Sequence, residues 1–416
     1  MNKDIGIYIH IPFCAGKCAY CDFYSLAGRD ELMDQYQKAL LRHIRETSSQ
    51  MEGYVADTVY FGGGTPSYYG ANRLIELFNA LKKYANVLVD SEVTLEMNPD
   101  SVRYGDLVKL KRAGFNRLSL GVQSANDSIL NSIGRLHTFA QAEKAVDDAR
   151  RAGFENISLD LIYGLPSQTR EDWADTLTRA AALKPDHVSC YGLKIDEGTP
   201  LYPFKNSPFI PDDDTQADMY IYAMEALPRF GYTQYEISNF ARRGYQSRHN
   251  LKYWTGQEYM AFGAAAHSYV NGQRFSYVAD VEKYIANIQR DRSVVDHLET
   301  INDFERAGEY IMLGLRTTRG ISEQEYYDIF PCKFDMAREL LDRYVAQGLM
   351  VKNGDRWSFT TRGFLLSNVL IADVLDAQTK QRMSIVAPWK EAEDDGDYQF
   401  SLFYQKPGTV QLFNGI

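Results

Sequence analysis

Short apolar runs alternate with longer amphipathic stretches along the chain up to about residue 195. The short runs are rich in β-branched residues, which favours strands, and the longer stretches repeat their apolar residues at helical spacing. The predicted strands are Ile5–His10, Thr58–Phe61, Val93–Glu96, Arg117–Leu120, Ile157–Leu161 and His187–Tyr191. The predicted helices between them are Asp30–Thr47, Ala71–Tyr84, Tyr104–Ala113, Ala140–Ala152 and Glu171–Leu183.

This order predicts repeated strand–helix units, which pair as parallel strands joined by right-handed crossovers. Two of the units look alike in sequence, KRAGFNRLSL from Lys111 and RRAGFENISL from Arg150. The pattern allows either a partial (βα)6 barrel of the TIM type or a doubly wound sheet. In both folds the functional residues lie at the carboxyl ends of the strands.

Three cysteines follow the first predicted strand: Cys14, Cys18 and Cys21, with the spacing C-x3-C-x2-C. The chain has only five cysteines and does not begin with the pattern of an export signal, so a thiol metal site is favoured over disulfides. An iron–sulfur cluster held by three thiolates would keep one iron open to a small molecule. Zinc held by the three cysteines and His10 is the alternative, and spacing alone leaves both open.

Polar groups also follow the later strands. Residues 61–66 form the loop FGGGTP, whose glycines let the backbone approach a ligand closely. Glu96 and Gln123 end the third and fourth strands, and Asp160 interrupts an apolar run. A carboxylate in a buried strand is costly unless it is paired or binds something, so these residues are candidates for a binding site.

Composition narrows the class of protein. Lys and Arg number 45 against 55 Asp and Glu, a formal net charge of −10, which argues against a general nucleic-acid binder. No apolar run reaches the length of a membrane-spanning helix. A chain of 416 residues is expected to form more than one domain.

The region after about residue 300 has a different pattern. Helices are predicted at Ser322–Phe330 and Asp335–Gln347, followed by a hairpin around Asn353-Gly354. This order is typical of a winged-helix module, for which DNA binding is an alternative. The second helix carries more acidic than basic residues, so a structural or lid role is favoured.

The motifs together resemble a known family. CAGKCAYC over residues 14–21 matches the signature of radical S-adenosylmethionine (SAM) enzymes. Residues 8–14, 61–66, 119–123 and 160–166 (YIHIPFC, FGGGTP, SLGVQ and DLIYGLP) are similar to the oxygen-independent coproporphyrinogen III oxidase family, which includes the heme chaperone HemW branch. The resemblance covers roughly residues 5–370.

The resemblance implies two cofactors. Cys14, Cys18 and Cys21 would hold a [4Fe–4S] cluster whose open iron binds S-adenosylmethionine, the source of a radical once the cluster is reduced. The residues that it implies around SAM are Tyr8, Tyr20, Gly63, Gly64, Thr65, Glu96, Gln123, Arg135 and Asp160. Carboxylates can accept hydrogen bonds from ribose or ammonium groups, and Arg135 can bind a carboxylate through two parallel bonds.

Two features resemble the HemW branch more than the oxidases. Phe23 stands where the oxidases carry a further cysteine, and the first strand begins almost at residue 1. The run HNLKYW, residues 249–254, is similar to a motif of that branch and implies heme contacts by His249, Asn250, Tyr253 and Trp254. The residues alone allow an alternative to heme contact. In it, His249 makes hydrogen bonds within a loop and Trp254 packs in a core.

The predicted function is that of a heme chaperone, which binds heme and transfers it to acceptor proteins. The competing prediction is an oxygen-independent coproporphyrinogen III oxidase of porphyrin biosynthesis, so whether the chain is an enzyme stays open. The resemblance implies heme or a porphyrin as ligand, heme-acceptor proteins, and a reductant such as a flavodoxin or ferredoxin. It also implies that the protein is located in the cytoplasm and has no nucleic-acid partner. Peripheral contact with a membrane and formation of a dimer are both compatible with it.

The expected domain organisation has four parts. Residues 1–200 form the radical SAM core barrel, residues 201–300 an extension with the HNxxYW motif, and residues 301–376 the winged-helix-like domain. Residues 377–416 have no assignment, and apolar residues at 400–404 and 410–413 predict a hairpin or docking strand there.

Overall fold

The structure is a computed structural model that describes residues 3–386. Its contacts divide the chain into two compact units. The first unit comprises the residues up to Asn302 together with Arg316–Arg319, and the second comprises Asp303–Leu315 and the residues from Gly320 onward.

The first unit is built on one twelve-stranded sheet. Its central strands lie side by side, parallel and in chain order: β1 (Lys3–Ile11), β4 (Tyr54–Gly63), β5 (Val87–Met97), β6 (Arg117–Gln123), β7 (Asn156–Tyr163) and β8 (His187–Gly192). They contain the predicted strands. Each of these six strands lies beside the preceding one, on the same side. The strand order therefore never reverses direction among them, as it would in a doubly wound sheet, and that alternative is excluded. The sheet is a partial barrel that ends at two free edge strands, β14 and β9, and does not close.

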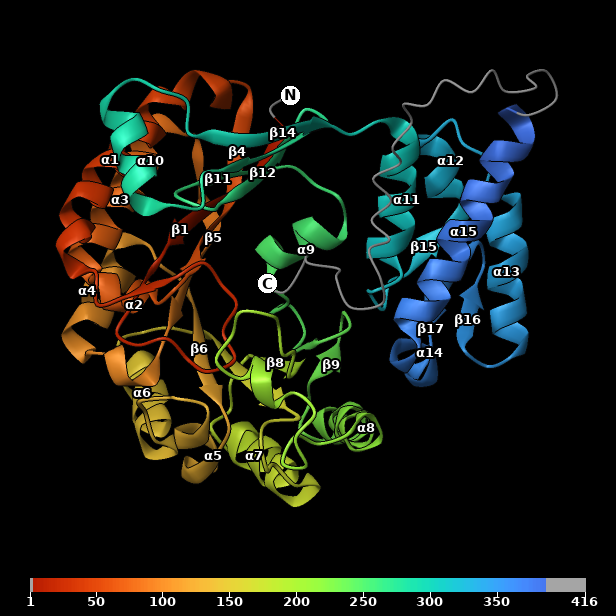
Figure 1. Cartoon of the computed structure of the whole chain (residues 1–416), viewed down its shortest axis with the longest axis horizontal. Coiled ribbons are helices and arrows are strands. Elements are labelled where there is room, and N and C mark those ends of the chain that lie inside the picture. The colour runs from red at the N-terminus through yellow and green to blue at the C-terminus, as the bar shows by residue number, and fades with distance from the viewer. Residues whose placement is uncertain (1–2, 387–416) are drawn as a thin grey trace. The chain divides into compact units, whose positions relative to one another are not determined.

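The helices between these strands cover one face of the sheet (Figure 1). They are α1 (Met33–Glu46), α3 (Ala71–Tyr84), α4 (Tyr104–Ala113), α6 (Phe139–Arg151) and α7 (Arg170–Ala182), close to the predicted bounds. Alternate strand residues such as Val59, Leu95 and Leu118 are fully or almost fully buried in the core. The residues between them face the inside of the barrel and are largely polar, because side chains alternate along a strand. Of the helices in residues 3–386, none combines the length and apolar character needed to cross a bilayer.

Shorter elements lie in the connections between these strands and helices. They are the parallel pair β2 (Phe13–Cys14) and β3 (Leu26–Ala27), helices α2 (Pro66–Tyr69) and α5 (Asp127–Ser132), and the 3-10 turns at Asp30–Leu32, Ser48–Met51, Pro99–Ser101 and Tyr202–Phe204.

Residues 201–300 extend both edges of the same sheet. Helix α8 (Asp213–Arg229), β9 (Thr233–Gln234) and β10 (Asn239–Ala241) follow β8, and β10 pairs antiparallel with it. At the other edge β11 (Tyr259–Phe262) lies parallel to β1. Antiparallel β12 (His267–Val270), β13 (Gln273–Tyr277) and β14 (Val295–Thr300) follow β11, with α9 (Arg248–Trp254) before it and α10 (Val281–Gln289) before β14.

The second unit is an α+β module with a three-stranded antiparallel sheet in the order β15-β17-β16. Its elements are α11 (Asp303–Gly314), β15 (Ile321–Ser322), α12 (Glu323–Ile329), α13 (Asp335–Ala346), β16 (Met350–Asn353), β17 (Arg356–Phe359), α14 (Thr361–Leu365) and α15 (Ser367–Val386). The two predicted helices and the Asn353-Gly354 hairpin are present, so the module has the predicted winged-helix order. Residues 377–386, which had no predicted element, belong to α15. The strand predictions at residues 400–404 and 410–413 lie outside the described residues.

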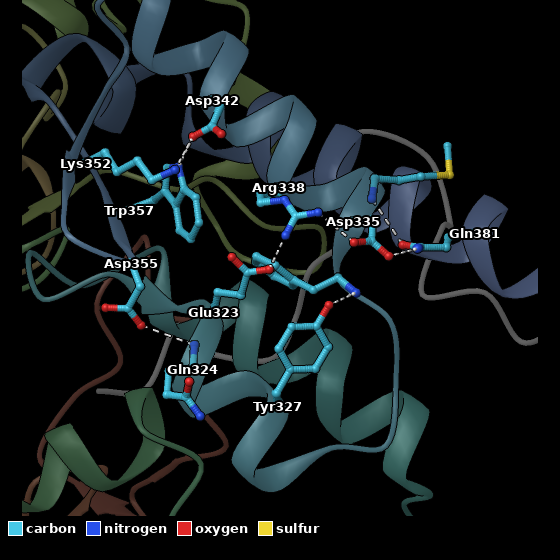
Figure 2. Close-up of polar contacts among 12 residues, drawn as sticks. Glu323, Gln324, Tyr327, Asp335, Arg338, Asp342, Lys352, Asp355, Trp357 and Gln381 are labelled. Carbon is cyan, nitrogen blue, oxygen red and sulfur yellow. Dashed lines mark hydrogen bonds and ion pairs between the residues drawn. The ribbon is translucent and has the colours of Figure 1, made fainter.

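Two basic side chains of the second unit, Arg338 and Lys352, form ion pairs with carboxylates of the same unit (Figure 2). Arg338 on α13 pairs with Glu323 and with Asp335, each at 2.6 Å, and Lys352 pairs with Asp342 at 2.9 Å. Asp342 also accepts a hydrogen bond from the indole Nε1 of the buried Trp357. Arg338, one of the two arginines on α13, is therefore neutralised by its own neighbours, which disfavours its use in phosphate contacts.

The hydroxyl of Tyr36 links helix α1 to β1 and to the segment that follows β11. Its hydroxyl donates to the backbone oxygen of His10 at 2.9 Å and accepts from the amide of Ala264 at 3.0 Å. Gly263 between them has φ of +113°, and a Cβ there would lie 2.5 Å from the Tyr36 oxygen. Only glycine fits this junction.

We expect Gly263→Ala to lower the free energy of unfolding by about 2 kcal/mol or more, since the new methyl displaces the Tyr36 hydroxyl as well as straining the backbone. Gly53→Ala is the matched control, because Gly53 also has a positive φ of +83° but nothing lies within 4 Å of its Cβ position. The Gly53→Ala control should lower the free energy of unfolding by only about 1 kcal/mol. Urea unfolding compares the two, and equal losses would contradict this account of the junction.

Candidate functional site

The cysteine loop begins at the end of the first barrel strand. Cys14 lies in β2 and is buried, and Cys18 and Cys21 are partly buried in the turn that follows. The turn is held in place by the Ala19 amide, which donates to Ile133 at 3.0 Å, and the Ala19 oxygen, which accepts from Leu201 at 2.9 Å.

Burial changes the acidity of these thiols. It raises the pKa of Cys14 and raises the pKa of Cys21 to about 11. Both groups are therefore protonated thiols at neutral pH, and metal binding would have to release their protons.

The glycine loop packs directly against the cysteine strand. The amide of Gly64 donates to the Ile11 oxygen and that of Thr65 to the Phe13 oxygen, both at 2.8 Å. The Thr65 hydroxyl donates to the Cys14 sulfur at 3.4 Å. A Cβ on Gly64 would lie 2.9 Å from that sulfur, so the absence of a side chain is what allows the two loops to meet.

His10 is not arranged as a fourth ligand to the cysteines. Its Nδ1 lies 3.1 Å from the Tyr8 hydroxyl and its Nε2 lies 3.0 Å from the Tyr24 oxygen, so both ring nitrogens are engaged. Ligation of zinc by His10 would therefore require one of these two hydrogen bonds to break.

Arg135 lies beside the cysteine loop. Its guanidinium donates to the Asn98 side chain at 2.8 Å and to the Gly121 oxygen at 2.5 Å, and it lies 3.6 Å from the Cys18 sulfur. These contacts hold a half-buried cation at the edge of a small pocket that Cys18, Thr65 and Asn98 also line. A fixed positive charge here suits an anionic cluster or a ligand carboxylate.

Two half-buried carboxylates face the inside of the barrel. Glu96 accepts from the Tyr60 hydroxyl at 2.9 Å and from the Gly63 amide at 3.1 Å, which joins it to the glycine loop. Asp160 accepts from Ser119 at 2.9 Å and Ser189 at 2.8 Å. Burial raises the pKa of both, that of Glu96 to about 7.

The remaining residues implied around SAM lie on the same rim or just below it. Tyr8 on β1 stacks on Tyr60 with ring centroids 6.1 Å apart. Tyr20 packs against an apolar cluster that includes Ile133 and Leu165. Gln123 ends β6 with φ of +65°, a left-handed conformation that is unusual for a residue other than glycine and typical of functional sites.

The HNxxYW motif lies elsewhere in the barrel. His249, Asn250 and Trp254 on α9 are buried, and a Cβ on Gly6, near the start of β1, would lie 3.1 Å from the His249 ring. Gly6 precedes His10 by four residues, or roughly 13 Å along a strand. The motif therefore lies toward the amino ends of the strands, but the His249 ring stacks on Tyr60 with centroids 5.2 Å apart, and Tyr60 in turn bonds Glu96.

His249 is fully engaged in this conformation. Its Nδ1 lies 2.8 Å from the Thr58 hydroxyl, and its Nε2 lies 3.0 Å from the hydroxyl of Tyr253. Glu92 accepts from its backbone amide and so caps α9. Burial lowers the pKa of His249 to about 3, so the ring is neutral. Iron ligation by His249 would require one of these hydrogen bonds to break.

Sequence reasoning missed Arg117, Asn98 and Tyr60 at this site. Arg117 was seen only as the start of a strand, yet it is 1 % exposed and its charge lowers the pKa of both Glu96 and Asp160. The available signal was its period-two alternation with Ser119 and Gly121, which points a charge into the barrel.

The fold and cysteine site define a class of protein, the radical SAM proteins. The Radical SAM superfamily model matches residues 8–180, and the HemN C-terminal domain model matches residues 301–366. A solved structure of coproporphyrinogen III oxidase (HemN) from Escherichia coli superposes with a TM-score of 0.80. It covers 91 % of this chain and 90 % of that one at 22 % identity, and so supports the fold.

Curated relatives narrow the class to one family. The heme chaperone HemW of Lactococcus lactis subsp. lactis is 34 % identical over 371 residues, 88 % of this chain and 96 % of the relative. That of Bacillus subtilis is 35 % identical, covering 87 % and 96 %, and that of Escherichia coli K12 is 33 % identical, covering 88 % and 97 %. The chain belongs to the HemW family of radical SAM proteins.

Membership of this superfamily implies a [4Fe–4S] cluster and SAM. The residues present fit that implication, since three free thiols, a glycine-rich loop and a half-buried guanidinium lie at one rim. When bound, the reduced cluster and SAM supply radical chemistry, and the chain's part is to hold and orient them.

We expect Gly64→Ala to prevent assembly of the cluster in a folded protein, because the added methyl would press on the Cys14 sulfur. Gly16→Ala is the matched control, since a Cβ on Gly16 would contact only the end of Leu136 at 4.0 Å. Iron and sulfide content after anaerobic reconstitution, with circular dichroism as a check of folding, measures the difference. Full cluster content in Gly64→Ala would contradict the role given to this loop.

Proposed function

We propose that this protein is a heme chaperone, which binds heme and transfers it to acceptor proteins on a scaffold that carries a [4Fe–4S] cluster and SAM. The observation that carries the proposal is similarity along almost the whole length of relatives named heme chaperone HemW, at 34 % identity over 96 % of one of them. The cysteine rim supports the cofactor part of the proposal independently.

Within the proposal, each rim residue has a stated role. Cys14, Cys18 and Cys21 ligate the cluster, and the backbone of Gly63, Gly64 and Thr65 contacts the methionine part of SAM. Arg135 binds an anionic group of the ligand, because its charge is fixed beside Cys18. The carboxylates of Glu96 and Asp160 accept from ammonium or ribose groups. Tyr8, Tyr20 and Gln123 complete the walls.

The residue at position 23, Phe23, favours the heme chaperone function over porphyrinogen oxidation. It occupies the place of the additional cysteine of the oxidases and is 38 % exposed next to the cluster loop. The similarity to HemN at 22 % identity concerns the fold and does not extend the oxidase activity to this chain. The proposal places the protein in the cytoplasm, where a flavodoxin or ferredoxin would supply electrons.

The raised pKa of Glu96 predicts pH-dependent SAM binding. A carboxylate with a pKa of about 7 is protonated at lower pH, so binding should weaken roughly tenfold per unit below pH 7 and level off above it. Glu96→Gln should bind SAM weakly at every pH, without that slope. Isothermal titration of the reconstituted protein from pH 5.5 to 8.5 measures this.

Glu236→Gln is the control for this experiment, because burial also raises the pKa of Glu236 to about 7 but its side chain is bonded to the Ser238 amide instead of the glycine loop. This variant should keep the slope. A slope that survives in Glu96→Gln and disappears in Glu236→Gln would contradict the assignment.

Heme titration combined with a turnover assay tests the proposal as a whole. The reconstituted full chain should bind hemin with a defined Soret band and stoichiometry, and should not decarboxylate coproporphyrinogen III when given SAM and a reductant. Decarboxylation at a useful rate, or the absence of any saturable hemin binding, would contradict the chaperone assignment.

A further inference from the structure

The inward side chains of β1 and β4 fill the inside of the barrel between α9 and the glycine loop. The two strands pair in parallel, with Tyr60 beside Tyr8. Side chains alternate along a strand, so Thr58 and Gly62 face the same interior as Tyr60. Thr58 lies one layer closer to the amino end of the barrel, and Gly62 lies one layer closer to the glycine loop. Tyr60 therefore occupies the middle layer between the cofactor rim and the motif on α9.

Tyr60 is engaged through both its hydroxyl and its ring. The hydroxyl donates to Glu96 Oε1 at 2.9 Å, and Glu96 Oε2 accepts from the Gly63 amide at 3.1 Å. The ring stacks on the imidazole of His249 with centroids 5.2 Å apart and 29° between the planes. One side chain thus contacts the carboxylate of the glycine loop and the first residue of the HNxxYW motif.

The packing around Tyr60 leaves little room for independent movement. A Cβ on Gly62 would lie 3.0 Å from Glu96 Oε2 and 3.0 Å from the Tyr60 ring. A Cβ on Gly6 would lie 3.1 Å from the His249 ring. Close-packed groups transmit a displacement to their neighbours, so a shift of the imidazole requires a shift of the tyrosine ring that it stacks on.

Iron ligation by His249 requires such a shift. Its Nδ1 lies 2.8 Å from the Thr58 hydroxyl and its Nε2 lies 3.0 Å from the Tyr253 hydroxyl. A ring nitrogen can bind iron only when one of these bonds opens, and the imidazole that turns to do so lies against Tyr60. The hydrogen bond from Tyr60 to Glu96 opposes that movement, because it fixes the ring on which His249 is stacked.

We propose that Tyr60 is a positioning residue that couples the SAM site to α9, so that SAM bound at the glycine loop weakens heme binding at α9. The inference rests on the proposed function and on the heme contacts that the HNxxYW motif implies. With the ammonium of SAM at Glu96, the carboxylate is ionised and the bond from the Tyr60 hydroxyl is charge-assisted and stronger. Tyr60 then keeps His249 in its own hydrogen bonds, and SAM acts as a signal for heme release. Such coupling is reciprocal, so bound heme weakens SAM binding by the same factor.

The test measures hemin binding to the reconstituted full chain by Soret titration, without SAM and with saturating SAM. In the wild type, the Kd for hemin should rise roughly fivefold when SAM is bound. Tyr60→Phe keeps the ring on His249 and removes only the hydroxyl that reaches Glu96. This variant should still bind hemin and SAM, but its Kd for hemin should change less than about twofold on addition of SAM.

Tyr54→Phe is the matched control. Tyr54 lies on the same strand, is also buried, and its hydroxyl also donates to a glutamate, Glu258, at 2.9 Å. That glutamate bonds Lys3 and the Asn271 amide instead of the glycine loop. Tyr54→Phe should therefore keep the wild-type response of hemin binding to SAM. Circular dichroism checks the folding of both variants, and isothermal titration confirms that each binds SAM.

The outcomes separate this inference from the proposed function. A wild-type protein that binds no hemin, or no SAM, contradicts the proposed function itself. A wild-type protein that binds both ligands, with the same Kd for hemin at zero and at saturating SAM, overturns the coupling and leaves the proposed function standing. A response of wild-type size in Tyr60→Phe, or a response lost equally in Tyr54→Phe, also overturns the role given to Tyr60.

Discussion

The structure depends on one constraint, the addition of parallel strands always at the same edge of the sheet. Because β1, β4, β5, β6, β7 and β8 follow each other without reversal, their helices all lie on one face and their carboxyl ends all meet at one rim. Cys14, Gly64, Glu96 and Arg135 come from loops or strand ends far apart in sequence, and this topology alone brings them together. A doubly wound order would have divided the helices between the two faces of the sheet and left no barrel interior.

The polar barrel interior is the second consequence of this topology. Glu96 and Asp160 are half-buried carboxylates, and desolvation alone would favour their neutral forms. Arg117 and the hydroxyls of Tyr60, Ser119 and Ser189 oppose that effect. These opposing effects leave Glu96, beside the glycine loop, with a pKa of about 7.

Much of this arrangement could be predicted from the sequence. The strands and helices of the first 195 residues were predictable because β-branched runs and helical periodicity repeat there without interruption. The two- to five-residue strands β9 to β13 were missed, since such short segments acquire their pairing from the sheet they join. The bond between His249 and Tyr253 joins residues four apart on α9, which helical spacing could have indicated, but the bond from Thr58 depends on tertiary packing that the motif does not reveal. Arg117 was missed because an arginine at the start of a strand normally reaches solvent.

The two ends of the barrel differ in what they can hold. The carboxyl end gathers thiols, a guanidinium and a glycine-rich loop, whereas the amino end is filled by α9 with Glu92 at its cap and a buried pair between Lys252 and Asp57 at 2.8 Å. The two ends meet inside the barrel, where His249 stacks on Tyr60 and Tyr60 bonds Glu96.

The central claim is that the cysteine rim holds a cluster whose open iron accepts SAM. Electron paramagnetic resonance of the anaerobically reconstituted, one-electron-reduced protein, recorded before and after SAM is added, tests this most directly. The account predicts a cluster signal whose g values shift when SAM binds, and no such signal in Cys14→Ser. A cluster signal that SAM leaves unchanged would contradict it.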